Sequence, residues 1–177
     1  MTADFERNHR AWDARTAIEA AGVDVRLVHL AGEHTPFAPA SFDVVFSDHG
    51  AMSFASPDAT IPEVARILRP GGVFAFNVEH PVHALSWDDA ANGPSRALHH
   101  PYFTLDRIDD PLDGSVNFAR RISTYVELLL ANGFTIERML EPRPPAGTPT
   151  TYGDFATEAW ARDFPAELMI RARRTAG

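Results

Sequence analysis

Apolar residues along the chain gather into short runs that alternate with helical patterns. VDVRLVHL (23–30), SFDVVFS (41–47) and VFAFNVEH (73–80) are rich in β-branched and aromatic residues, which is typical of buried strands. Between the last two, DATIPEVARIL (58–68) has apolar residues at helical spacing and runs into a proline-glycine-glycine stop at residues 70–72. Strand, helix and strand with tight connections predict a βαβ unit of a parallel sheet.

The flanking segments add helices and two further strands. The apolar stripe in residues 4–21 predicts an amino-terminal helix within residues 1–22, with Gly22 as its stop. SVNFARRISTYVELLLANGF predicts a second helix that ends at Gly133, and EAWARDF a short third one. TIERMLEP and AELMIRARR predict two strands that form an antiparallel edge of the sheet.

Residues 80–117 are dense in Pro, Asp, His and Asn and show no clear period, which predicts a long functional loop. Its histidines and acidic residues, namely His80, His83, His99, His100, Asp88 and Asp89, suggest a metal site at first sight. The HPVH spacing differs from that of a helical zinc pair, and Pro81 is expected to break any helix between the two histidines. We therefore predict solvated loop histidines and no metal site, and a metal-dependent hydrolase built on these histidines stays open as a third, disfavoured function.

Composition narrows the classes of function. The formal net charge is −8, and all 16 cationic residues are arginines scattered along the chain, which disfavours nucleic acid and anionic membranes as partners. The absence of cysteine excludes disulfides, thiolate metal sites and cysteine nucleophiles. The chain shows no signal-peptide or membrane-spanning pattern, so we expect a cytoplasmic protein with a single domain over residues 1–177.

Several segments in order give the chain a family resemblance. PFAPASFDVVFSDHGAMSF, EVARILRPGGVFAFNV and LLLANGFTIERMLEP resemble the middle and later parts of class I S-adenosylmethionine (SAM) dependent methyltransferases of the type 11 kind. The terminal WARDFPAELMIRARR resembles the family's approach to its last strand. The resemblance implies an α/β, Rossmann-like, mostly parallel sheet with an antiparallel edge strand, and transfer of a methyl group from SAM to a small-molecule acceptor.

The same resemblance implies a binding site at the carboxyl ends of the strands. Gly32 and Glu33 correspond to the family's loop near the adenine, where the usual Gly-Asp is replaced by Leu30-Ala31. Ser47, Asp48, His49 and Gly50 correspond to the loop that passes the methyl donor and the acceptor. The histidine and the carboxylate there suit binding or general-base catalysis, although Asp48 is equally suited to capping a turn.

The sequence also departs from the family pattern in one respect. The glycine-rich turn that follows the first family strand is not found, and residues 4–22 resemble two helices joined without the first two strands. This predicts a truncated fold in which residues 23–30 need a new neighbour or lie at an exposed edge, where a homo-oligomer can form. Two functions therefore stay open: a methyltransferase with no assignable catalytic residue, or an inactive remnant that serves as a protein-interaction module.

Overall fold

The computed structural model of the chain describes residues 28, 30–109, 114–147 and 155–176. Its elements in chain order are β1 (Phe42–Asp48), α3 (Ala51–Phe54), α4 (Pro57–Ile67), β2 (Leu68–Glu79), α5 (Pro81–Ser86), β3 (Trp87–Asp88), β4 (Gly93–Pro94), η1 (Tyr102–Thr104), β5 (Arg107–Asp109), β6 (Val116–Phe118), α6 (Ile122–Ala131), β7 (Phe134–Leu140), α7 (Glu158–Ala161) and β8 (Glu167–Arg174).

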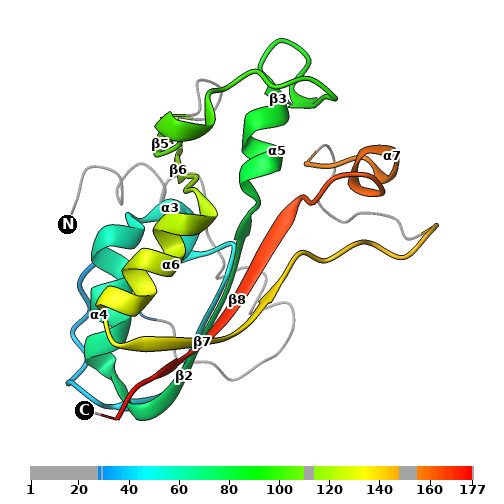
Figure 1. The fold of residues 1–177 in the computed structure, drawn as a ribbon. Helices are drawn as coiled ribbons and strands as arrows, with labels where there is room; N and C mark the ends of the chain where they lie inside the picture. Colours follow the sequence, from blue (N-terminus) through cyan, green and yellow to red (C-terminus); the bar gives the residue numbers. More distant parts are fainter. Residues whose placement is uncertain (1–27, 29, 110–113, 148–154, 177) are drawn as a thin grey trace.

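Four of these strands form one sheet in the order β1-β2-β8-β7 (Figure 1). β1 and β2 run parallel and are connected through α3 and α4, as the βαβ pattern predicts. β8 runs antiparallel to both of its neighbours, β2 and β7. The predicted α/β, Rossmann-like class is therefore confirmed. The antiparallel strand β8 is next to the edge of the described sheet rather than at it, because β7 lies outside it.

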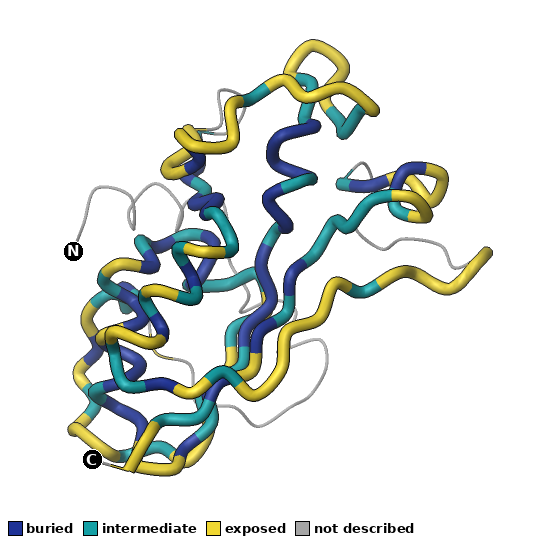
Figure 2. Tube along the Cα trace, viewed as in Figure 1, coloured by how far each residue is buried: buried dark blue, intermediate teal, exposed yellow. Residues whose placement is uncertain are grey.

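The helices α3, α4 and α6 all lie on one face of the sheet (Figure 1). Strand β2 turns alternate side chains toward them, so Phe74, Phe76 and Val78 are buried in the main core. Helix α6 adds Tyr125 and Leu129, both fully buried. Buried positions accordingly follow β2, β8 and the inner sides of the helices, whereas β7 is largely exposed (Figure 2).

The boundary between α4 and β2 differs from the prediction. The helix begins after Ser56 with Pro57 in its first turn, where a missing N–H is tolerated, and its predicted apolar face is buried. It ends at Ile67, however, and the proline-glycine-glycine segment lies inside the twelve-residue strand β2 rather than between helix and strand. Gly71 has a φ of +81°, a left-handed conformation that glycine adopts readily, at the point where the chain reverses.

Residues 80–117 are not the structureless loop that we predicted. They contain α5, the β3–β4 pair, η1 and the β5–β6 pair. The expectation that Pro81 breaks a helix between His80 and His83 is wrong, because Pro81 is the first residue of α5 and His80 caps it by accepting a hydrogen bond from the Val82 N–H at 3.0 Å. Proline is well suited to a helix start, where its lack of an N–H has no consequence.

The remaining predictions have different outcomes. Helices α6 and α7 and strands β7 and β8 lie where the sequence predicts them, with Gly133 following α6 at a φ of +73°. The predicted helix at residues 4–21 lies outside the described residues, as does most of the predicted strand at 23–30. Of the latter, only Val28 and Leu30 are described, and neither is in a strand. No helix in the described ranges combines the length and apolarity needed to cross a bilayer.

Candidate functional site

Polar side chains meet at the carboxyl ends of β1 and β2. Asp48 and Asn77 are register partners, and the alternation along β2 places both on the face away from the buried Phe76 and Val78. The Asn77 Nδ2 donates hydrogen bonds to Asp48 Oδ1 at 3.0 Å and to Glu167 Oε2 at 3.2 Å. Residues from three strands are thereby joined at the edge of the sheet where open α/β folds bind ligands.

His49 extends this group of side chains. Its Nε2 lies 3.3 Å from Glu167 Oε1, and this contact is the main reason why the pKa of Glu167 is lowered. The carboxylate is therefore ionised at neutral pH and accepts a hydrogen bond from the histidine N–H. His49 also has a φ of +44°, which is uncommon for a non-glycine residue, and such backbone strain occurs preferentially at functional sites.

A second pair of a histidine and a glutamate lies deeper, at the end of β2. His83 on α5 is fully buried, with its Nδ1 2.5 Å from Glu79 Oε1 and its Nε2 2.5 Å from the carbonyl oxygen of Phe155. The other Glu79 oxygen accepts a hydrogen bond from Asn117 Nδ2 at 3.2 Å. A carbonyl oxygen only accepts, so Nε2 carries a proton, and this buried group ties the strand end to α5 and the segment before α7.

His80 has a structural role beside this pair. Burial is the largest cause that lowers the pKa of His80, so the ring is neutral at neutral pH. Its Nδ1 accepts the Val82 N–H, so the proton sits on Nε2, which donates to Glu141 Oε1 at 3.0 Å. His80 therefore holds the start of α5 and Glu141, the residue that follows β7, in place. Both of its ring nitrogens take part in hydrogen bonds.

The loop before β1 packs against the start of α3. A Cβ placed on Gly32 would lie 2.7 Å from Ala51 Cβ, closer than real side chains approach, so only glycine allows this contact. The predicted residue Gly32 thus lies next to Ala51, which directly follows the segment of the predicted residues Ser47, Asp48, His49 and Gly50, and Glu33 is its neighbour in the chain. Glu33 Oε2 is buried and has no hydrogen-bond partner. A buried acceptor without a donor suits a ligand that carries an N–H or O–H group.

Ser47 and Gly50 shape the backbone. The Ser47 Oγ accepts a hydrogen bond from the Met52 N–H at 3.4 Å. The Gly50 carbonyl accepts from the Ser53 and Phe54 N–H groups and so begins α3. These two predicted residues hold the turn between strand and helix.

A buried carboxylate anchors this loop to α4. Glu63 is 6% exposed, and its Oε1 accepts hydrogen bonds from the Thr35 N–H at 2.7 Å and the Thr35 hydroxyl at 2.6 Å. Arg66 donates to both Glu63 oxygens and, with its other N–H groups, to the carbonyl oxygens of Phe37 and Thr35. The hydrogen bond from Arg66 is the largest cause that lowers the pKa of Glu63 to about 2.

His99 and His100 each contact a neighbouring polar group. His99 Nε2 contacts Ser95 Oγ at 2.8 Å, and His100 Nε2 contacts the Trp87 carbonyl oxygen at 3.1 Å. Within the described ranges, no three His, Asp or Glu side chains are grouped so as to hold a metal ion. Tyr102 and Phe103, in the same segment, pack on each other with ring centroids 5.4 Å apart and stay exposed.

Three residues of the site are not indicated by the sequence patterns. Asn77, Glu167 and Phe155 come from a strand interior, a strand start and a loop before a short helix. A signal existed for Asn77, because it is a lone polar residue within the apolar run VFAFNV. Glu167 and Phe155 carry no such signal, since only the antiparallel placement of β8 brings them to this end of the sheet.

Comparisons with known proteins agree with this fold. The family model described as a methyltransferase domain matches residues 4–76. A putative SAM-dependent methyltransferase from Listeria monocytogenes has a similar structure, with a TM-score of 0.71 and 24% identity over 93% of this chain and 77% of that one. A SAM-dependent methyltransferase from Mesorhizobium loti gives a TM-score of 0.69 and 25% identity over 90% and 74%.

In the sequence of residues 4–76 and in its fold, the chain is similar to SAM-dependent methyltransferases. No curated protein matches it in sequence. The cyclase SpnF has a related fold, with a TM-score of 0.56 and 14% identity over 93% of this chain and 62% of that one. A shared methyltransferase fold therefore does not fix the reaction, which has to be argued from the site.

SAM is the cofactor that this fold implies, and the described residues fit part of it. The unpartnered Glu33 oxygen suits a hydroxyl or amino donor of the coenzyme, and the tight contact at Gly32 shapes the loop beside it. Ala31 is buried at the position where the family usually has an acidic residue, so Glu33 is the acidic side chain that this loop offers.

Proposed function

We propose that the chain is a SAM-dependent methyltransferase that acts on a small molecule. The coenzyme would be held by the loop of Gly32 and Glu33 and by the strand-end segment 47–50, and the acceptor by the group of Asp48, His49, Asn77 and Glu167. The observation that carries the proposal is this polar group at the carboxyl ends of β1 and β2, where the fold binds its ligands.

The residues of this group have separate roles in the proposal. When bound, SAM supplies an electrophilic methyl group on a positively charged sulfur. Asp48 and Asn77 orient the acceptor, and the pair of His49 and Glu167 takes up the proton that the acceptor loses. Positioning does most of the remaining work, so no further reactive side chain is needed.

Titration calorimetry with SAM and with its demethylated product tests the coenzyme part. We expect saturable heat with the full chain, and a Kd at least tenfold higher for Glu33→Gln, which loses the charge but keeps the size. Asp89→Asn makes the same change on an exposed loop and serves as the control. An absence of heat at millimolar ligand, with circular dichroism showing folded protein, would end the proposal.

A second function is favoured by one observation. On β1, at one edge of the described sheet, Val44 is 57% exposed and Phe46 is 77% exposed. Exposed apolar side chains on such a strand suit an interaction module or a homo-oligomer. Light scattering on the wild type and on Phe46→Arg tests this: a mass of twice the chain that falls to one chain in the variant supports it, and a monomeric wild type argues against a homo-oligomer. The predicted cytoplasmic location remains a prediction.

A further inference from the structure

The side-chain carbonyl of Asn77 lacks a hydrogen-bond donor. Asn77 is 8% exposed, and its Oδ1 is buried without any partner. The orientation of the amide is fixed, because Nδ2 faces the carboxylates of Asp48 and Glu167, which only accept hydrogen bonds. The amide lies between the two carboxylates, so a buried acceptor within this group awaits a donor.

The side chains around Asn77 also need hydrogen-bond donors. Asp48 and Glu167 are acceptors when ionised, and both protons of the Asn77 amide nitrogen are already used between them. His49 is the basic side chain in contact, and its Nε2 faces Glu167. A ligand that completes this group therefore has several N–H donors and a positive charge.

An aromatic ring adds to this environment. Phe155 packs edge-on against His49, with ring centroids 5.8 Å apart, and stacks on the buried His83 at 4.2 Å. An aromatic ring next to carboxylates attracts a cation through its quadrupole. Acceptors, negative charge and an aromatic ring thus occur together at one end of the sheet.

We infer that the methyl acceptor is an amine that binds as an ammonium to Asp48, Glu167 and the Asn77 Oδ1. The inference rests on the proposed function, because it assigns the acceptor of the same site. An ammonium nitrogen has no lone pair, so it first gives a proton to the pair of His49 and Glu167. The nitrogen lone pair then forms the bond to the methyl carbon, whose bond to sulfur breaks with its electron pair remaining on sulfur.

Two probes of equal shape test the charge requirement. Phenethylammonium and 2-phenylethanol share one carbon skeleton and differ in the charged group. In NMR titrations of the ¹⁵N-labelled full chain, we expect phenethylammonium to shift the side-chain NH₂ signals of Asn77 saturably. The alcohol should bind at least tenfold more weakly, which corresponds to about 1.4 kcal/mol. Equal binding of both probes, or shifts that avoid Asn77, would show that the inference is wrong.

Variants separate this inference from the proposed function. Asp48→Asn and Glu167→Gln should each weaken the ammonium probe at least tenfold, while the control Asp89→Asn leaves it unchanged. SAM affinity is measured on the same proteins. If SAM binds and the ammonium does not, the inference fails and the proposed function stands. If the ammonium binds and SAM does not, the ammonium site stands, but the proposed function fails, and with it the role of the amine as a methyl acceptor. If Asp48→Asn weakens SAM alone, the carboxylates serve the coenzyme and the inference is overturned.

Discussion

Replacing Glu63 with glutamine tests how strongly the loop of Gly32 and Glu33 is anchored to α4. Glu63 ionises with a pKa of about 2 instead of 4.5, mainly because Arg66 donates hydrogen bonds to it. One pKa unit corresponds to about 1.4 kcal/mol, so the ionised group stabilises the folded chain by about 3 kcal/mol at pH 7. Glutamine has nearly the same shape but leaves Arg66 without its charged partner.

The pH dependence has a definite sign. Because the pKa is lower in the folded state, the unfolded chain takes up the proton first as the pH falls. The stabilisation is therefore complete above about pH 5 and declines toward pH 2, with about 1.4 kcal/mol left at pH 3. We expect Glu63→Gln to lose about 3 kcal/mol at pH 7 and clearly less at pH 3.

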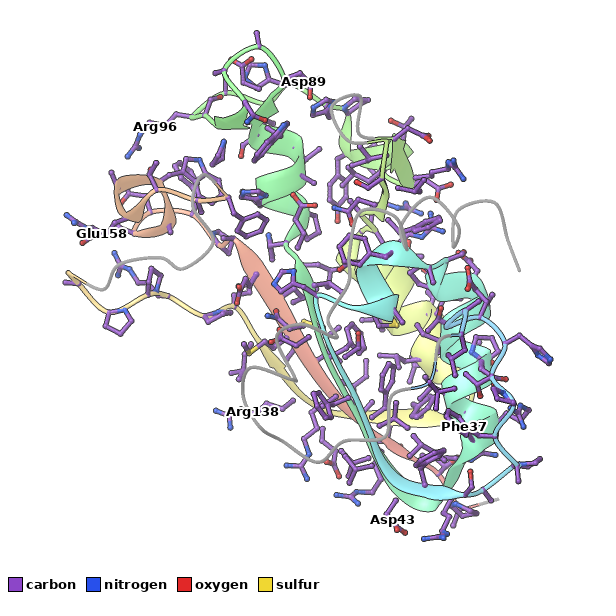
Figure 3. The ribbon with its side chains drawn as sticks, turned by 180° about the vertical axis from the view of Figure 1, so that it is seen from behind. Phe37, Asp43, Asp89, Arg96, Arg138 and Glu158 are labelled. Carbon is purple, nitrogen blue, oxygen red and sulfur yellow. The ribbon has the colours of Figure 1, made fainter. Side chains whose placement is uncertain are left out.

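Urea unfolding followed by circular dichroism measures both losses, with the difference between wild type and variant taken at each pH. Asp89→Asn is the matched control, since Asp89 lies in an exposed loop at the far end of the molecule from Phe37, whose carbonyl contacts Arg66 (Figure 3). A loss below about 0.5 kcal/mol at pH 7, or an equal loss at pH 7 and pH 3, would refute the reasoning.

Three further substitutions have expected outcomes in the same assay. Gly32→Ala should cost about 1–3 kcal/mol, because its Cβ meets Ala51, whereas Gly93→Ala, where the Cβ meets nothing within 4 Å, should be close to neutral; equal effects would contradict the contact. Leu129→Ala should cost about 2–5 kcal/mol, because the Leu129 side chain is fully buried. Leu130→Ala, at the neighbouring side chain that is 59% exposed, should cost about 0.5 kcal/mol or less. Similar losses in the two variants would show that α6 is rotated. Tyr125→Phe should leave stability unchanged or raise it, because the buried hydroxyl has no partner; a loss above about 1 kcal/mol would reveal a hidden hydrogen bond.

Much of the fold follows from the sequence pattern because burial imposes a period on each element. The apolar residues of α4 and the alternating Phe74, Phe76 and Val78 are sufficient to identify a helix and a strand. The same reasoning fails for residues 80–117, because α5 and the small strand pairs are too short to establish a period. Pro81 begins a helix instead of breaking one, and only the capping contact of His80 decides between the two.

The candidate site could be predicted only in part. Asp48 and His49 follow directly from their position at the end of a strand. Glu167 is 118 residues away from His49, and nothing in the local sequence indicates that a carboxylate at the start of the last strand lies opposite the end of β1 and β2. Long-range contacts of this kind come from sheet order, so the parts of a site they supply are the ones that local patterns miss.

The place of β8 within the sheet has a consequence for biosynthesis. β8 lies between β2 and β7, although it is the last of the described strands to be translated. During translation β2 and β7 are therefore made before the strand that joins them, and the sheet can close only after β8 has been made. Deleting the whole of β8 removes the middle of the sheet rather than a tail, and such a truncated product should be a substrate for chaperones and proteases instead of a shorter working protein.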